Sequence, residues 1–278
     1  MKVSEKLGLG TVQFGLSYGI SNKHGKTSKE EVQKILSSAR ENGIEMLDSA
    51  SAYGNAEEVL GTSHISSFKL VSKFLPPLEG EKVLDQLRKS FENLRLDHIY
   101  GYLAHRPIEL LNHPEQWEEL QNFKAEGTVE KIGFSLNEPE ELEKLLEKGY
   151  KPDLVQVPYN YFDRRFESAI QKLKEQGCEI HTRSAFLQGL FFMDPNELSE
   201  YFDEVKSLLK QLREIELLNG ALLKFVLERP FIDKVITGVE NEAQLLQNID
   251  SIEKAPALPK LTETVSDNVL IPSRWAKS

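Results

Sequence analysis

The sequence predicts an α/β protein, a single-domain (β/α)8 barrel, and three observations support this. Eight short apolar runs alternate with longer segments whose apolar residues recur every three to four positions. Glycines stand where several of those longer segments should end. No linker or low-complexity tract divides the 278 residues. Eight strands, each followed by a helix, favour a closed parallel barrel, and a doubly wound open sheet is the alternative.

The elements follow in order along the chain. Strands are expected at residues 7–11, 45–48, 69–73, 99–104, 131–135, 153–158, 178–183 and 233–237. Ser28 and Glu31 have the spacing of a capping box at the start of the first long helix. Helical apolar stripes are formed by Val32, Ile35, Leu36 and Ala39, by Leu84, Leu87, Phe91 and Leu94, and by Phe166, Ala169, Ile170 and Leu173. Helices should end at Gly43, Gly127, Gly149 and Gly177.

Two regions depart from the regular alternation. Between residues 183 and 233 there is room for two helices, 197–217 and 219–228, rather than one. The C-terminal tail, about residues 253–278, contains Pro256, Pro259 and Pro272 and is too irregular for another strand and helix. We expect this tail either to pack over one mouth of the barrel or to be a frayed end.

Composition excludes several classes of protein. Apolar residues make up 40% and charged residues 28% of the chain, as in ordinary globular proteins. No window approaches a membrane span, and the first residues lack a targeting signal, so we expect a cytoplasmic protein. We also expect a monomer or weak homo-oligomer. The net charge of −10 argues against nucleic acid or an anionic membrane as a partner. Cys178, the single cysteine, is expected in the packed core.

Some familiar motifs fail on spacing. The stretch from Gly19 to Thr27 resembles a phosphate loop but has five residues between its glycines where the motif needs four. Gly8-Leu9-Gly10 lacks the third glycine of a dinucleotide-binding fingerprint. The histidines show no spacing suited to zinc, so we expect no metal site.

Four polar residues remain at consecutive strand ends: Asp48, Tyr53 in the loop beyond it, Lys73 and His105. In a parallel barrel the carboxyl ends of the strands share one face, so these side chains should meet. Each has an ordinary structural explanation: a buried Asp–Lys ion pair, an aromatic residue at the core edge, and a histidine that caps its strand. Together their chemistry is complementary, which favours a catalytic site.

This chemistry is the protonation of a carbonyl oxygen. A phenol is a poor acid at neutral pH, but a neighbouring lysine ammonium favours the phenolate and makes the proton easier to give up. Asp48 would keep Lys73 charged, and His105 would orient the substrate oxygen toward Tyr53. No side chain here supplies electrons, so a reduction requires a bound hydride donor.

The sequence resembles the aldo-keto reductases from about residue 7 to residue 248. Leu47-Asp48-Ser49-Ala50-Ser51-Ala52-Tyr53-Gly54 is similar to the family's Asp-x-Ala-x-x-Tyr-Gly signature. Further similar motifs are Ser72-Lys73, Leu103-Ala104-His105, Gly133-Phe134-Ser135, Gln156-Val157-Pro158-Tyr159-Asn160, and Ile236-Thr237-Gly238 with Gln244 and Asn248. The resemblance implies a barrel that binds NADPH or NADH without a Rossmann fold and reduces an aldehyde or ketone, a sugar-like or other small carbonyl compound.

The resemblance also implies binding residues. Those expected for the cofactor are Gly10, Thr11, Asp48, Ser135, Gln156, Arg183, Ser184, Phe186, Leu187, Gln188, Gly189, Gly238, Val239, Gln244 and Asn248. Ser135 and Gln156 would contact the nicotinamide carboxamide, and Arg183 stands where many members have a ring-stacking tyrosine. Expected to wall the substrate pocket are Gln13, Phe14, Phe74, Arg106, Tyr159 and Trp275, although core packing equally explains the aromatic ones.

Cofactor preference is predicted from one departure. Members that prefer NADPH commonly carry Lys or Arg after the eighth strand to pair with the 2′-phosphate. Residues 238–244 contain no base and two acids, Glu240 and Glu242, so we predict that NADH is accepted.

Two alternative functions remain. Lys73 would be the Schiff-base lysine of an aldolase built on the same barrel. In the second alternative, the protein would be a binding subunit that senses the cofactor and works together with a partner protein.

Overall fold

The computed structural model describes residues 3–22 and 24–275 and shows a closed barrel of eight parallel strands in the order β1 to β8. The strands are β1 (Leu7–Gly10), β2 (Met46–Asp48), β3 (Lys69–Phe74), β4 (Ile99–Ala104), β5 (Val129–Ser135), β6 (Leu154–Pro158), β7 (Glu179–Arg183) and β8 (Lys234–Gly238). β8 pairs with β1, from Leu7 opposite Val235 to Gly10 opposite Gly238. This closure confirms the predicted barrel and excludes the open sheet.

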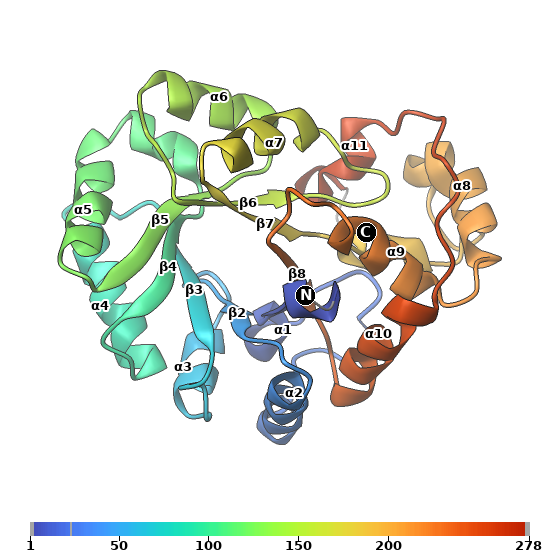
Figure 1. The fold of residues 1–278 in the computed structure, drawn as a ribbon, viewed down its shortest axis with the longest axis horizontal. Coiled ribbons are helices and arrows are strands. Elements are labelled where there is room, and N and C mark those ends of the chain that lie inside the picture. Colours follow the sequence, from blue (N-terminus) through green and yellow to red (C-terminus); the bar gives the residue numbers. More distant parts are fainter. Residues whose placement is uncertain (1–2, 23, 276–278) are drawn as a thin grey trace.

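Helices surround the barrel, with α4 and α5 on one side of the view in Figure 1 and α8 to α10 on the other. The α-helices are α1 (Val12–Gly15), α2 (Lys29–Glu41), α3 (Ala56–Gly61), α4 (Val83–Leu94), α5 (Pro114–Ala125), α6 (Pro139–Glu147), α7 (Glu167–Glu175), α8 (Asp203–Arg213), α9 (Leu218–Leu227), α10 (Glu242–Lys254) and α11 (Asp267–Leu270). The 3-10 helices are η1 (Val3–Lys6), η2 (Pro107–Leu111), η3 (Leu187–Phe192), η4 (Glu200–Phe202) and η5 (Pro272–Arg274). None of the helices in these described stretches combines the length and hydrophobicity that crossing a bilayer requires.

The predicted helix boundaries have clear local causes. Gly43, Gly127, Gly149 and Gly177 all have positive φ, between 77° and 87°, just after α2, α5, α6 and α7. The predicted capping box of α2 is half formed. The Ser28 hydroxyl accepts from the Glu31 amide, but the Glu31 carboxylate accepts from the Glu242 amide of α10 instead.

The main core lies between the strands and the surrounding helices. Outward-facing residues such as Leu47, Ile132 and Val155 pack with the predicted stripes of α2, α4 and α7. A smaller apolar layer fills the barrel interior and consists of Met46, Val71, Leu103, Leu154 and Ile236. Cys178 is buried in the main core, and burial raises the pKa of its thiol to about 12, so it is inert packing.

The region after β7 differs from the predicted helix 197–217. Its first turn is the 3-10 helix η4, and α8 runs only from Asp203 to Arg213. The backbone is extended at Ser199 and left-handed at Leu217, where φ is 55°, and both conformations interrupt a helix. The predicted second helix is present as α9.

The described part of the C-terminal tail is packed rather than frayed. Val269 and Leu270 of α11 are buried in an apolar cluster with Val205 and Leu209 of α8, and Figure 1 shows α11 close to α8. The Trp275 indole donates to the Val269 carbonyl and its ring packs against Phe202. The tail therefore packs on α8 and also reaches the loops after β5 and β6, where Arg274 pairs with Glu138 and Asp267 with Arg165.

Candidate active site

Asp48, Tyr53, Lys73 and His105 meet at the carboxyl ends of β2, β3 and β4. The Lys73 ammonium lies 2.8 and 2.7 Å from the two Asp48 carboxylate oxygens, and it also donates to the Ser49 carbonyl at 2.9 Å. Its nitrogen is 3.5 Å from the Tyr53 hydroxyl. The His105 ring stands edge-on to the Tyr53 ring, with centroids 5.9 Å apart.

Backbone contacts hold Tyr53 at this place. The loop from Ser49 to Gly54 turns away from β2, and Gly54 takes a positive φ of 59°. Gly15, at the end of α1, packs directly on it: a Cβ on Gly15 would stand 1.7 Å from the Tyr53 carbonyl oxygen. Only glycine permits this approach, which fixes the loop against α1.

Charge pairing keeps Lys73 protonated. The residue is fully buried, and burial disfavours the ammonium, but Asp48 and Tyr53 outweigh that cost, so the pKa of Lys73 is raised. His105 shows the opposite effect. Burial and the positive charges of Lys73, Arg183 and Arg106 lower its pKa to about 3, so the imidazole is neutral across the physiological range.

A pocket of about 550 Å³ opens beside this group, with Asp48 and Tyr53 in its wall. Of the residues predicted to bind the cofactor, twelve line this pocket: Gly10, Thr11, Asp48, Arg183, Ser184, Phe186, Gln188, Gly189, Gly238, Val239, Gln244 and Asn248. The other three lie outside the lining. Ser135 is buried at the end of β5, Gln156 is buried in the middle of β6, and Leu187 is buried in an apolar cluster with residues of α8.

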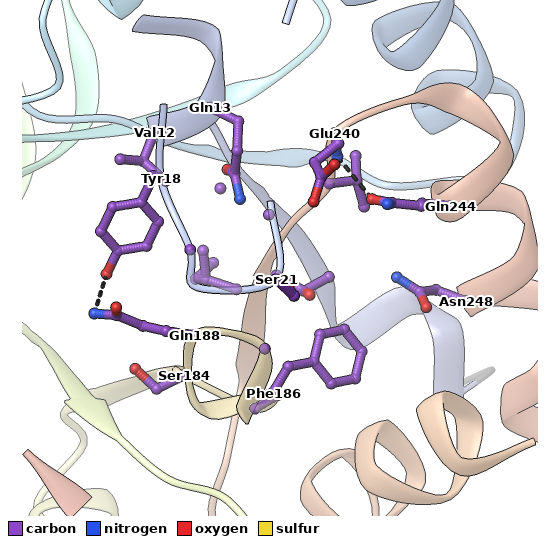
Figure 2. Close-up of a pocket in the computed structure, with 18 of the residues that line it drawn as sticks. Val12, Gln13, Tyr18, Ser21, Ser184, Phe186, Gln188, Glu240, Gln244 and Asn248 are labelled. Carbon is purple, nitrogen blue, oxygen red and sulfur yellow. Dashed lines mark hydrogen bonds between the residues drawn. The ribbon is translucent and has the colours of Figure 1, made fainter. Parts of the chain in front are cut away.

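The loop between α1 and α2 crosses the pocket and meets the segment after β7. Gln188 donates from its side chain to the Tyr18 hydroxyl at 2.8 Å, drawn in Figure 2, and its carbonyl accepts from the Ile20 amide. Gly189, with φ of 94°, leaves room for Ser21. Tyr18 and Ser21 were not predicted as lining residues. The only signal for them in the sequence is the long gap between the first strand and its helix.

The outer end of the pocket is acidic and amide-rich. Glu240, Gln244 and Asn248 point into it from the side opposite Tyr18 and Gln188 (Figure 2). The Gln244 amide oxygen accepts from the Glu240 backbone, and Asn219 of α9 donates to the Asn248 amide oxygen. The N-terminus of α9, which also lines the pocket, was not predicted as part of the site.

Several predicted substrate contacts require correction. Gln13 lines the pocket, whereas Arg106 is exposed beside His105, outside the lining. Phe14, Phe74 and Tyr159 were expected as walls, and this is wrong because all three are buried in the core. Phe74 faces the outer layer against Tyr102, and Tyr159 stacks on Phe225 of α9. Trp275 was also expected there and instead packs on Phe202 beside α8.

Arg183 lines the pocket in a fixed position. Its guanidinium donates to the Leu136 carbonyl at 2.8 Å and to the Asn137 side chain at 2.6 Å, both in the loop after β5. These bonds connect the end of β7 to the loop that follows β5, past the intervening strand β6. They hold the guanidinium at the wall of the pocket, close enough to His105 to affect its charge.

Comparison with known proteins places the chain in a family. A sequence profile of the aldo/keto reductase family matches residues 6–260. The chain belongs to the aldo-keto reductases. It is 26% identical to YqkF, an uncharacterised oxidoreductase of Bacillus subtilis, over 87% of this chain and 89% of that protein. It is also 26% identical to the glyoxal reductase of Bacillus subtilis, over 81% of this chain and 84% of that one.

A partial sequence match and two solved structures extend the comparison. The match to the methylglyoxal reductase DkgA of Escherichia coli has 28% identity but spans only 55% of this chain and 56% of that enzyme. Among solved structures, the holo form of an aldo-keto reductase from Bacillus halodurans superposes with a TM-score of 0.70 at 22% identity, covering 91% of this chain and 88% of that one. An aldo/keto reductase from Klebsiella pneumoniae in complex with NADP and acetate has a TM-score of 0.64 at 20% identity, covering 95% and 88%. The protein is an oxidoreductase of this family.

Proposed function

We propose that the protein reduces a small aldehyde or ketone to an alcohol with a nicotinamide cofactor as hydride donor. The observation that carries this proposal is the buried Lys73 ammonium, which contacts both the Asp48 carboxylate and the Tyr53 hydroxyl at the wall of the pocket. That arrangement suits a proton donor to a carbonyl oxygen.

Each residue has a distinct part. Neutral His105 donates a hydrogen bond to the substrate oxygen and holds it beside Tyr53. The Tyr53 hydroxyl gives its proton to that oxygen as negative charge develops there. Lys73 stabilises the phenolate left behind, and Asp48 keeps Lys73 charged. A reduced nicotinamide, when bound, supplies the hydride.

The pocket fits such a cofactor. Gly10 and Gly238 face each other across paired strands, and both line the pocket. Gly238 leaves room for the Gln13 amide, whose oxygen would stand 2.4 Å from a Cβ at that position. That Gln13 oxygen is buried and has no hydrogen-bond partner among the described residues. The middle of the dinucleotide would be held by Ser184, Gln188 and Gly189, and its outer end by Gln244 and Asn248. Our candidates for contacting the nicotinamide carboxamide are still Ser135 and Gln156.

We further propose that NADH is accepted and preferred. Among the described residues that line the pocket, Arg183 is the only base, and it is bonded to Leu136 and Asn137. The outer end carries Glu240 instead. A carboxylate can accept from the hydroxyls of an unmodified ribose, whereas it repels a 2′-phosphate.

The substrate class is a small carbonyl compound. The names of two relatives, a glyoxal and a methylglyoxal reductase, support small aldehydes. The aldolase alternative is disfavoured because a Schiff-base lysine must be neutral and accessible, and Lys73 is fully buried with its pKa raised.

The proposal is tested by assaying NADH and NADPH oxidation with glyoxal, methylglyoxal and sugar aldehydes. Wild-type turnover is expected, and Tyr53→Phe should lose most of it while fluorescence titration shows nearly unchanged cofactor binding. Full activity of Tyr53→Phe would remove Tyr53 as the acid. Cofactor binding without turnover on any carbonyl compound would favour the sensing subunit.

A further inference from the structure

A second polar cluster lies inside the barrel, below the apolar interior layer of Met46, Val71, Leu103, Leu154 and Ile236. Its centre is Glu179, near the start of β7. The Glu179 carboxylate accepts from the Tyr100 hydroxyl at 2.5 Å and is paired with Lys131. Burial alone would raise the pKa of this carboxyl, but hydrogen bonds from His181, Lys131 and Tyr100 lower it.

His181 connects this lower cluster to the level of the active site. It is two residues further along β7 than Glu179, so both side chains face the barrel interior. Its Nε2 lies 2.6 Å from the Glu179 carboxylate, and the residue has no exposed surface. Its other ring nitrogen, Nδ1, is buried with no hydrogen-bond partner among the described residues.

Gln156 is the neighbour that matches this free nitrogen. Gln156 pairs with His181 in the register of β6 and β7, so the two side chains project from the same face. The Gln156 amide donates to the Asp48 carboxylate at 2.7 Å. Its amide oxygen is also buried, and within the described chain it has no partner either. Two adjacent interior residues therefore each present one unsatisfied polar atom.

Hydrogen-bond chemistry indicates what joins them. If the Nε2 proton of a neutral imidazole goes to Glu179, Nδ1 is an acceptor, and the Gln156 oxygen is also an acceptor. A water molecule that donates to both satisfies them, since buried waters occupy sites with several polar partners. The Gln156 oxygen has two lone pairs, so one remains for the cofactor carboxamide.

We propose that His181 is a positioning residue: through a buried water it holds the Gln156 amide, and Gln156 in turn holds Asp48 against Lys73 and Tyr53. The Asp48 oxygen bonded by Gln156 is the one that lies 2.8 Å from the Lys73 ammonium. Loss of the link would let the carboxylate turn, and the ammonium would follow it away from the phenol. The effect on reduction rests on the proposed function; the positioning itself does not.

The test compares His181→Phe, which keeps ring volume without nitrogens, with His181→Asn, whose amide can donate directly to Gln156. Thr182→Val is the matched control, because Thr182 is equally buried on the same strand but faces outward. We expect His181→Phe to lower kcat for carbonyl reduction about tenfold or more, because small displacements at an active site are costly. The cofactor Kd should change by a smaller factor than kcat, because the other residues proposed to hold the cofactor are untouched. His181→Asn should recover most of kcat, and Thr182→Val should keep it.

Crystal structures of wild type and His181→Phe decide the positioning without any turnover. Wild type should show a water within hydrogen-bonding distance of His181 Nδ1 and Gln156 Oε1. In the variant, the bond between Gln156 and Asp48 should be broken or rearranged. An unchanged Gln156–Asp48–Lys73 geometry in His181→Phe, or equal kcat in His181→Phe and Thr182→Val, would overturn the proposal. Absence of turnover in wild type would refute the proposed function alone.

Discussion

Acid sensitivity of the fold should be traceable to His105. Its pKa is about 3 in the native protein and 6.5 for an unperturbed histidine, because the native site is buried and surrounded by Lys73, Arg183 and Arg106. Below pH 6.5 the unfolded chain therefore binds a proton that the native protein does not bind. Stability from this group is complete above pH 6.5 and is lost as the pH falls toward 3.

The size of the effect follows from the two pKa values. A pH of 5 lies 1.5 units below the pKa of 6.5 in the unfolded chain. Protonation therefore stabilises the unfolded chain by about 2 kcal/mol, at 1.36 kcal/mol per pH unit. Urea unfolding of the wild type and of His105→Gln at pH 7.5 and pH 5.0 measures it. The loss of stability between these pH values should be about 2 kcal/mol smaller in the variant.

A matched variant controls for histidine removal in general. His64 is exposed, so His64→Gln should lose as much stability between pH 7.5 and pH 5.0 as the wild type. Equal pH dependence in His105→Gln and the wild type would refute the reasoning, because it would mean that His105 binds its proton as readily in the native protein as in the unfolded chain.

Three further experiments test other parts of the site. Lys73→Met should destabilise the protein by about 3–5 kcal/mol in urea unfolding, because it leaves the Asp48 charge buried and unpaired. Adding Asp48→Asn to this variant should recover much of the lost stability, and no recovery would contradict the pairing of Asp48 with Lys73. Glu240→Arg should shift the ratio of NADPH to NADH affinity by about tenfold or more toward NADPH in fluorescence titrations, whereas an unchanged ratio would exclude Glu240 from the ribose site. Tyr18→Phe removes the bond to Gln188 and should speed cofactor release about two- to tenfold in stopped-flow measurements, and an unchanged rate would show that this contact does not retain the cofactor.

The sequence predicted the fold because its local signals agree with each other. Strand ends, helix stripes and the stop positions at Gly43 and Gly127 are local features that tertiary packing did not override. The grouping of the four candidate catalytic residues followed from topology, since parallel strands in a barrel present their carboxyl ends on one face.

Side-chain direction was not predictable in the same way. Phe74 directly follows Lys73 on β3, so it points to the opposite face of the barrel and packs on Tyr102, outside the site. The contact of Tyr18 with Gln188 joins residues 170 positions apart through two irregular loops, for which neither strand nor helix periodicity gives a signal. Trp275 was misplaced because a tail without periodicity carries no information about the surface it covers.

Stability does not explain why the barrel buries Asp48 and Lys73 together. Removing two charges from water costs several kcal/mol for each, and buried ion pairs can often be replaced by apolar residues with equal or better stability. The apolar layer directly below, with Val71 on the same strand as Lys73, shows that this interior accepts apolar side chains. The ion pair instead places a fixed positive charge 3.5 Å from the hydroxyl of Tyr53, which lines the pocket. A charge held there without reorganisation is what the proposed proton transfer from that phenol requires, so the proposed chemistry accounts for the cost of burial.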